Sequence, residues 1–208
     1  MKTTFALLSC ALTMAFQSHA QTFVPSQNNK LDKAEAIRML DGGSSTITGQ
    51  VFARDNQGGL IPGVSILNTN EKQYARAGTE VVLMPYTAYF REYLAESKKQ
   101  HRRGKSLLLP NEVVECMKFA KTGGRGKYIF DKLTEGKYFI YTSFGYVHQG
   151  TQTDVVGQRD HYVNGVYQGS SDLTNSYGVT TGVRVFVEKI ITIDKDGEVK
   201  EVNLKRTK

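Results

Sequence analysis

The segment from Thr122 to Tyr141, TGGRGKYIFDKLTEGKYFIY, constrains the fold more than any other part of the chain. Its glycines at 123, 124 and 126 predict a turn, because glycine reaches positive φ without steric cost. Tyr128 and Phe130 then fall on one face of a predicted strand, and a break at 133–136 precedes a second aromatic strand. Two short aromatic strands separated by turns indicate an antiparallel sheet.

The same alternation divides the side chains of this segment between two faces. Phe139 and Tyr141 lie on the face opposite Tyr138, and we predict either that they lie under a helix or that they form part of a binding face. The residues that we expect in the core, where their removal should unfold the domain, are Tyr128, Phe130, Leu133, Tyr138 and Ile140.

The first twenty residues have the pattern of a secretory signal. Lys2 precedes an apolar run, and the triplet Ser-His-Ala at 18–20 provides a small-x-small cleavage site. The run is too short to span a membrane, and too few apolar residues precede Cys10 for a lipid to be expected there. We therefore predict an exported protein, periplasmic or extracellular, with no transmembrane segment in its mature chain and a flexible leader at 21–45.

Positive charge is concentrated in one short run. The formal net charge is +7, or +6 without Lys2, and much of the excess lies between residues 98 and 105. Such a cluster can bind anionic lipid or acidic polysaccharide, or it can be a solvated loop, and nucleic acid is not an expected partner of an exported protein. The candidate binding residues of this run are Lys98, Lys99, Arg102 and Arg103.

Between residues 46 and 120 the apolar residues are spaced first as in β-strands and then, over one stretch, as in a helix. Alternation predicts strands at 46–53 and 79–85, the second with apolar residues on both faces and therefore central in its sheet. Spacing by three and four predicts a helix over 87–99, capped by Thr87 and followed by the basic loop. Both the strand spacing and the helix spacing fit the next stretch. We favour a strand at 114–120 that forms a hairpin with the segment beginning at Thr122.

The carboxyl-terminal third contains one long polar stretch between strands. Residues 143–182 are rich in Gly, Ser, Thr, Asn and Tyr, with short β-like pieces such as 160–167, and predict an extended loop or a protruding hairpin. A strand then begins near residue 182, and an Asp196-Gly197 turn predicts a final hairpin. We thus expect a single domain at 46–208 with insertions at 86–112 and 143–182.

Four tyrosines in this stretch are candidates for recognition. Tyrosine among small polar residues is the mixture that protein-binding loops and carbohydrate platforms use, although tyrosines in β proteins also pack at sheet margins. The candidate binding residues are Tyr146, Tyr162, Tyr167 and Tyr177.

Three stretches resemble the carboxypeptidase regulatory-like domain family, which has a transthyretin-like sandwich. They are ITGQV at 47–51, AGTEVVLMP at 77–85 and GKYIFDKLTEGKY at 126–138. The resemblance covers about 46–141 and implies an all-β, antiparallel Greek-key β-sandwich of about seven strands, transthyretin-like or immunoglobulin-like, with one short inserted helix. It implies no activity, because such domains are accessory modules of metallocarboxypeptidases and also occur alone on exported proteins.

Residue patterns for catalysis are weak. The sequence has no His-Glu-x-x-His motif, and His148 and His161 would need neighbouring loops to converge with Asp154 or Asp160, so we expect no metal and no cofactor. Cys116 has no activating neighbour except Lys118, and its simplest role is that of a small buried residue.

These observations together predict a non-enzymatic module of the periplasm or cell envelope. We expect it to bind an envelope or secreted protein, or itself as an oligomer, through loops on a β-sandwich. The alternative is a carbohydrate or anionic-polymer binding module, and a metal-dependent hydrolase is the third hypothesis.

Overall fold

Strand β2 (Ser45–Arg54) is the centre of the first sheet in the computed structural model, which describes residues 21–55 and 72–207. It pairs antiparallel with β7 (Lys127–Leu133) and β3 (Lys72–Tyr74) on one side. On the other side it pairs parallel with β10 (Val199–Glu201) and β11 (Leu204–Thr207), which keep one register. The final strand therefore departs from the expected all-antiparallel arrangement.

Gly49 lies where the last strand comes closest to β2. The Val202 amide donates to the Thr48 carbonyl at 2.7 Å, and a Cβ at position 49 would lie 1.8 Å from the Val202 carbonyl oxygen. No side chain fits at that distance. The glycine in the predicted first strand is thus required by a close approach between two backbones.

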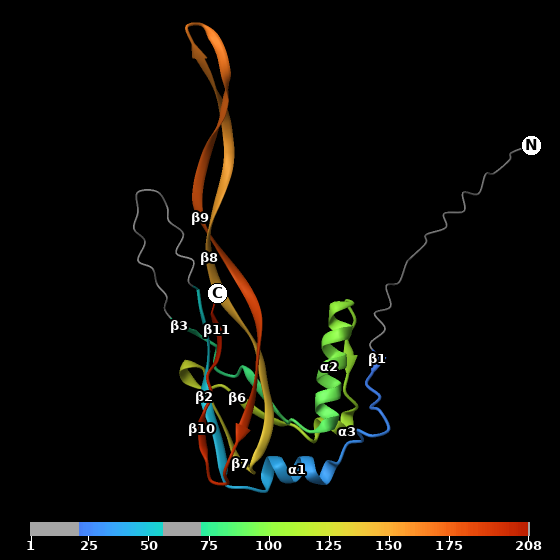
Figure 1. Ribbon diagram of the computed structural model, residues 1–208. Helices are drawn as coiled ribbons and strands as arrows, with labels where there is room; N and C mark the ends of the chain where they lie inside the picture. The colour runs from blue at the N-terminus through green and yellow to red at the C-terminus, as the bar shows by residue number, and fades with distance from the viewer. Residues whose placement is uncertain (1–20, 56–71, 208) are drawn as a thin grey trace, which may run out of the picture.

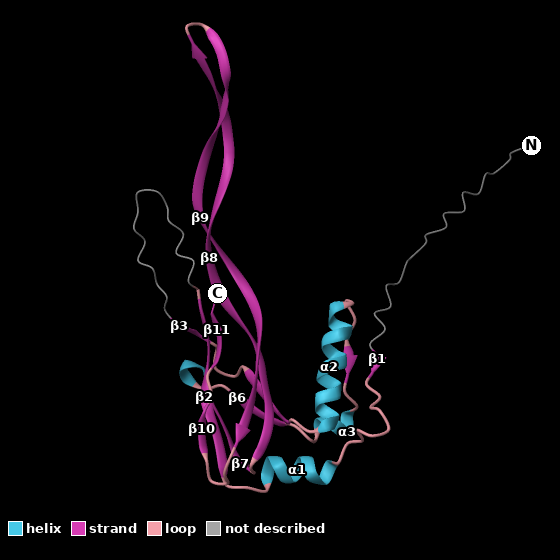
Figure 2. Cartoon of the chain, in the orientation of Figure 1, coloured by secondary structure: helices cyan, strands magenta, loops and turns pink. Residues whose placement is uncertain are grey.

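The second sheet is antiparallel, with the order β6 (Lys118–Lys121), β4 (Glu80–Pro85), β8 (Gly136–Val163) and β9 (Val166–Ile193). The two sheets lie as neighbouring layers, and strands dominate the structure (Figure 1, Figure 2). Residues Val81 to Pro85 of β4 are all buried, which confirms that this strand is central with two covered faces. The predicted fold class, an all-β sandwich with a helix inserted after this strand, is confirmed.

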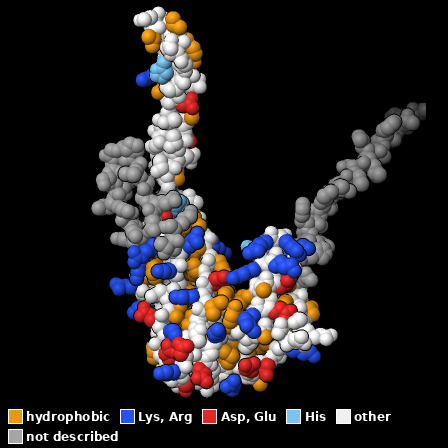
Figure 3. Space-filling model, in the orientation of Figure 1, with side chains coloured by type: hydrophobic (Ala, Val, Ile, Leu, Met, Phe, Trp, Pro, Cys, Tyr) orange, Lys and Arg blue, Asp and Glu red, His pale blue; other side chains and the backbone are white. Residues whose placement is uncertain are grey.

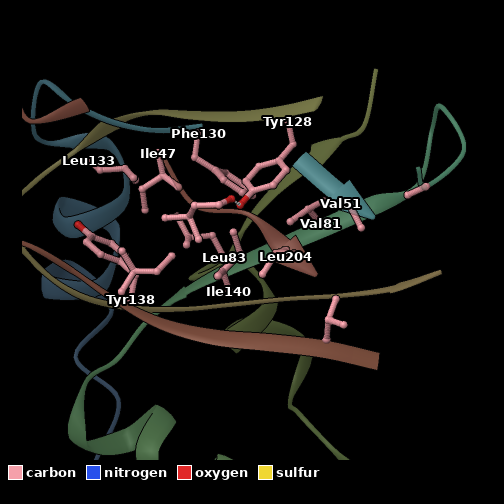
Figure 4. Close-up of a cluster of buried hydrophobic side chains, with 14 of the residues drawn as sticks. Ile47, Val51, Val81, Leu83, Tyr128, Phe130, Leu133, Tyr138, Ile140 and Leu204 are labelled. Atoms are coloured by element: carbon pink, nitrogen blue, oxygen red, sulfur yellow. Dashed lines mark hydrogen bonds between the residues drawn. The ribbon is translucent and has the colours of Figure 1, made fainter. Parts of the chain in front are cut away.

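The main core lies between the two sheets (Figure 4). Ile47 and Phe130 from the first sheet face Leu83 and Ile140 from the second, and each is 2% exposed or less. Two buried tyrosines keep their hydroxyls bonded: Tyr128 donates to the Val202 carbonyl at 2.5 Å and Tyr138 to the Met39 carbonyl at 2.7 Å. All five side chains that we predicted in the core are buried, which confirms that prediction.

A second apolar cluster covers the outer face of the four-stranded sheet. Helix α2 (Ala88–Arg102) places Tyr89 and Phe90 against Phe139, which is 3% exposed, and Tyr141 packs at the margin of this cluster. Of the two alternatives for Phe139 and Tyr141, the structure shows the one under the helix. The cluster also includes α3 (Asn111–Val114) and Phe23, which follows β1 (Gln21–Thr22); β1 pairs with β5 (Leu107–Leu108).

Helix α1 (Lys33–Asp41) begins at Asp32, whose carboxylate accepts from the Glu35 amide at 2.9 Å. Its Met39 and Leu40 join the main core, and the helix closes the end of the sandwich (Figure 1). Much of the segment predicted to be a flexible leader, 21–45, is therefore packed against the sandwich.

Several local predictions were wrong in how elements continue or pair. Residues 114–120 form no single strand: α3 ends at Val114, Cys116 is buried in the turn that follows, and β6 then pairs with β4. Strands β6 and β7, predicted to form a hairpin, lie in different sheets, and so do β7 and β8. The Asp196-Gly197 turn likewise passes from β9 to the other sheet. A local turn sequence reverses the chain but does not specify the partner of the next strand.

Two further details differ from the sequence predictions. Thr87 occupies the N-cap position of α2 but makes no side-chain capping bond, and its buried hydroxyl has no hydrogen-bond partner among the described residues. The basic run at 98–102 forms the last turns of the helix instead of a loop.

One prediction lies outside the described residues, namely the signal sequence at 1–20 with Cys10. Within the described ranges, no helix is long and apolar enough to cross a membrane.

Candidate functional site

A long two-stranded hairpin extends from the sandwich and is the most prominent surface feature (Figure 1). We call residues 147–182 the arm. Strands β8 and β9 stay paired from Gly136↔Ile193 to Val163↔Val166. At about 3.3 Å per residue, each side of the arm is about 55 Å long. Of the two alternatives for the 143–182 region, the protruding hairpin is the one that forms.

The end of the arm is an Asn-Gly turn. Asn164 and Gly165 have φ values of 49° and 77°, as a two-residue type I′ turn requires. This turn matches the right-handed twist of paired strands, and Asn-Gly between apolar residues is a strong hairpin signal. The prediction of one β-like piece over 160–167 was wrong because it overlooked this dipeptide.

Four large side chains at the end of the arm are exposed to solvent. Tyr162 and Tyr167 contact each other edge to face, with ring centroids 5.6 Å apart, and two valines flank the turn beside them. We call this group the tip; its members and exposed fractions are Tyr162 61%, Val163 58%, Val166 61% and Tyr167 54%. The sequence predictions identified the tyrosines but missed the valines, although their place beside Asn-Gly was a usable signal.

Polar cross-strand contacts connect the two strands between the tip and the sandwich. Thr153 and Ser176 join hydroxyls at 2.8 Å, and His161 Nε2 contacts the Ser171 hydroxyl at 2.8 Å. Tyr177 donates to Asp154 Oδ2 at 2.8 Å, and this bond to a carboxylate raises the pKa of the phenol. Such pairs supply stability to a ribbon that has no core of its own.

Hydrogen bonds connect the base of the arm to the edge of the first sheet. The side-chain amide of Gln73, on β3, bonds both backbone groups of Val147: its Nε2 donates to the Val147 carbonyl and its Oε1 accepts from the Val147 N–H, both at 2.8 Å. Next to it, His148 Nδ1 lies 3.0 Å from both carboxylate oxygens of Asp55, whose side chain is 6% exposed. The arm is thereby held where it leaves the sandwich.

The four candidate tyrosines do not form one platform. Tyr146 is 5% exposed and lies in the main core, so its prediction as a binding residue was wrong. Tyr177 is 40% exposed but lies ten residues from Tyr167 on the same strand, which is about 33 Å along the arm. Only Tyr162 and Tyr167 are brought together.

The candidate basic residues lie at the carboxyl end of α2, on the side of the sandwich and far from the tip (Figure 1, Figure 3). Lys98 bonds Glu188 of β9 at 2.5 Å, and Lys99 bonds Glu96 at 3.2 Å. Arg102 ends the helix and Arg103 follows as its C-cap. Cations at this end complement the helix dipole, which gives the cluster a structural role whether or not it binds a ligand.

The residues considered for catalysis are not assembled. His148 and His161 lie on one strand thirteen residues apart, about 43 Å, so they cannot converge on a metal. No group of three metal-ligating side chains occurs in the described part of the chain. Cys116 is fully buried, and burial raises the pKa of its thiol, which opposes formation of the nucleophilic thiolate.

A second exposed apolar surface lies on β9 beside α2 (Figure 3). Phe186 is 57% exposed and stacks at 5.4 Å on Tyr141, while Ile190 is 49% exposed. We call Tyr141, Phe186 and Ile190 the β9 patch. It adjoins an open hollow of about 430 Å³ whose lining includes Glu80, Tyr141 and Arg184. Sequence reasoning predicted neither Phe186 nor Ile190 as a surface residue.

Comparison with known proteins gives similarity in structure only. No family model and no curated protein matches the chain. A Pseudomonas aeruginosa protein proposed to bind carbohydrate has 18% identity and a TM-score of 0.49, with 85% of this chain and 98% of that chain covered. A minor pilin of Streptococcus agalactiae has 12% identity and a TM-score of 0.27, with 79% and 96% covered. At these values neither likeness carries an argument about function.

Proposed function

We propose that the protein is a non-enzymatic, exported interaction module that binds a protein partner through the tip of its arm. The observation that supports this proposal is the exposure of four large side chains around the single turn at the end of the arm, Tyr162, Val163, Val166 and Tyr167. The other exposed large apolar side chains of the arm are spread along its length: Val147, Val155, Val156, Leu173 and Tyr177. Exposed apolar groups cost free energy in water, and their concentration at one point is typical of a contact surface. The sandwich then serves as the rigid frame from which the arm extends.

The composition of the tip favours a protein over a carbohydrate. The two tyrosine rings meet at an interplanar angle of 64°, so they present no continuous flat face for a sugar ring. Valines 163 and 166 add aliphatic surface beside them, which suits an apolar pocket better than a surface of hydroxyls.

The strength of such a contact can be bounded. Burying a Val-sized or Tyr-sized side chain fully contributes about 1.5–3 kcal/mol, and the tip side chains are already partly buried. Four of them would contribute roughly 4–8 kcal/mol, which is comparable with the cost of association. The strands next to the tip must therefore add contacts, and we expect moderate affinity.

A pull-down from envelope extract tests the proposal. We expect the double variant Tyr162→Ser/Tyr167→Ser to lose the partners that the natural chain captures, because the aromatic anchors are removed. Val199→Ser is the matched control, since Val199 is 70% exposed on β10 and lies outside the arm. Circular dichroism of each variant checks that the fold is retained, and unchanged partners for the double variant would contradict the proposal.

The same preparation separates the carbohydrate or anionic-polymer alternative. Binding that depends on Lys98, Lys99, Arg102 and Arg103 should weaken as salt screens the charges. Binding through an apolar tip should change little. Glycan binding that falls with salt and is insensitive to the tip substitutions would favour the alternative.

A further inference from the structure

We propose that the partner of the tip is a second copy of this chain, and that the tip docks on the β9 patch of that copy. The inference rests on the proposed function, since it names the partner of the same surface. It joins the two apolar surfaces described above: Tyr162 to Tyr167 at the tip, and exposed Phe186 and Ile190 with half-buried Tyr141 beside α2.

Apolar chemistry matches on the two sides. The tip presents two tyrosine rings and two valines, and the β9 patch presents an aromatic stack that begins at buried Phe139, continues through Tyr141 and ends at Phe186. An incoming tyrosine ring can extend this stack. Ile190, four residues along the same strand, provides an aliphatic contact for a valine.

Charge also favours docking on the patch over pairing of two tips. The arm carries one Arg and three Asp, a net charge of −2, whereas the rest of the chain after residue 20 has 25 basic and 17 acidic residues, a net charge of +8. Two tips placed together would bring Asp160 and Asp172 of both copies close, which is repulsive. Placed on the patch, these carboxylates approach Arg184, which lies beside Tyr141 at one end of it. Between Phe186 and Ile190 the same strand face carries Glu188, and Lys98 pairs with this acid.

The backbone offers a further set of bonds. In the described part of the chain β9 pairs with β8 alone, so its outer edge carries free amide and carbonyl groups beside the patch. An arm lying along this edge can add a strand to the sheet. Because tip and patch are different surfaces, the contact is heterologous and joins copies head to tail into a chain or a ring.

The test uses the purified full chain and two complementary variants. The tip variant is Tyr162→Ser/Tyr167→Ser, and the patch variant is Phe186→Ser/Ile190→Thr. By sedimentation velocity we expect the natural chain to form species that grow with concentration, and each variant alone to self-associate at least tenfold more weakly. An equimolar mixture of the two should form one-to-one dimers and nothing larger, since one intact tip and one intact patch remain.

Val199→Ser should assemble like the natural chain, and single Ile190→Thr, which leaves the Phe186 stack intact, serves if the double patch variant does not fold. A patch variant that still assembles while the tip variant does not would show tip-to-tip pairing and overturn the inference. A natural chain that stays monomeric would also overturn it, yet the proposed function would stand if envelope partners are still captured through the tip.

Discussion

The sandwich and the arm are built from the same two strands, β8 and β9, but different forces hold them. In the sandwich, alternate residues of β8 such as Tyr138, Ile140 and Phe144 are buried against a second sheet. In the arm the same strands have no layer to pack on, and hydroxyl, amide and carboxylate contacts join them instead. The difference separates residues that determine the fold from residues that are free for recognition.

The largest effect should come from truncating the sandwich core. Phe130 is 2% exposed between the sheets, so Phe130→Ala should lower the free energy of unfolding by about 3–5 kcal/mol. Urea denaturation followed by circular dichroism measures this. Ile129→Ala is the control, because Ile129 points outward and is 61% exposed, and the comparison fails if both substitutions cost the same.

A smaller loss is expected where two backbones meet in the sandwich. Gly49→Ala places a Cβ where the Val202 carbonyl lies, and relief of that clash should cost about 1–3 kcal/mol. Gly182→Ala, at the base of the arm, meets nothing within 4 Å and should leave the thermal midpoint almost unchanged. Equal shifts for the two variants would contradict this assignment.

Strain in the arm should remain local. Gly165→Ala forces a side chain into the left-handed region at φ 77°, a cost of about 1–2 kcal/mol. Because the arm lacks a core, we expect faster amide exchange near the tip with little change in the global unfolding free energy. Ser170→Ala on the exposed side of β9 is the control, and faster exchange throughout the sandwich would show that the two regions unfold together.

The smallest effect concerns acid stability. Hydrogen bonds from the amide and hydroxyl of Ser44 lower the pKa of Asp196 below 3.8. Its contribution to stability is thus present above pH 3.8 and disappears as pH falls through the lowered value. Ser44→Ala removes the hydroxyl bond, so it should slightly lower the urea midpoint at neutral pH and converge with the natural chain in acid. A difference that grows in acid would contradict this.

The sequence predicted the core better than the connections. Period-two alternation placed Tyr128, Phe130 and Tyr138 inside, because a strand with one buried face has an apolar residue at every second position. Continued through Phe144, the same alternation also places Tyr146 inside, and assigning a loop from residue 143 hid that signal. Which sheet β7 or β10 joins depends on contacts between segments far apart in the chain. A turn sequence does not predict those contacts.

The tip and the β9 patch also differ in whether the sequence alone could have predicted them. The tip could have been found, because Asn164-Gly165 with flanking valines and tyrosines is a local hairpin signal. The β9 patch could not, because Phe186 and Ile190 are exposed only where α2 stops covering the sheet. That boundary follows from the packing of an insertion a hundred residues earlier in the chain.

The anchoring of both arm strands in the sandwich has a mechanical consequence. A pull on the tip along the arm is shared by two continuous backbones, and it does not peel the cross-strand hydrogen bonds apart one at a time. At the lower end each backbone continues into a strand of the four-stranded sheet, and Gln73 and Asp55 hold β8 from the side. The arm is therefore a tether of nearly fixed length, able to transmit tension from its tip into the core of the sandwich.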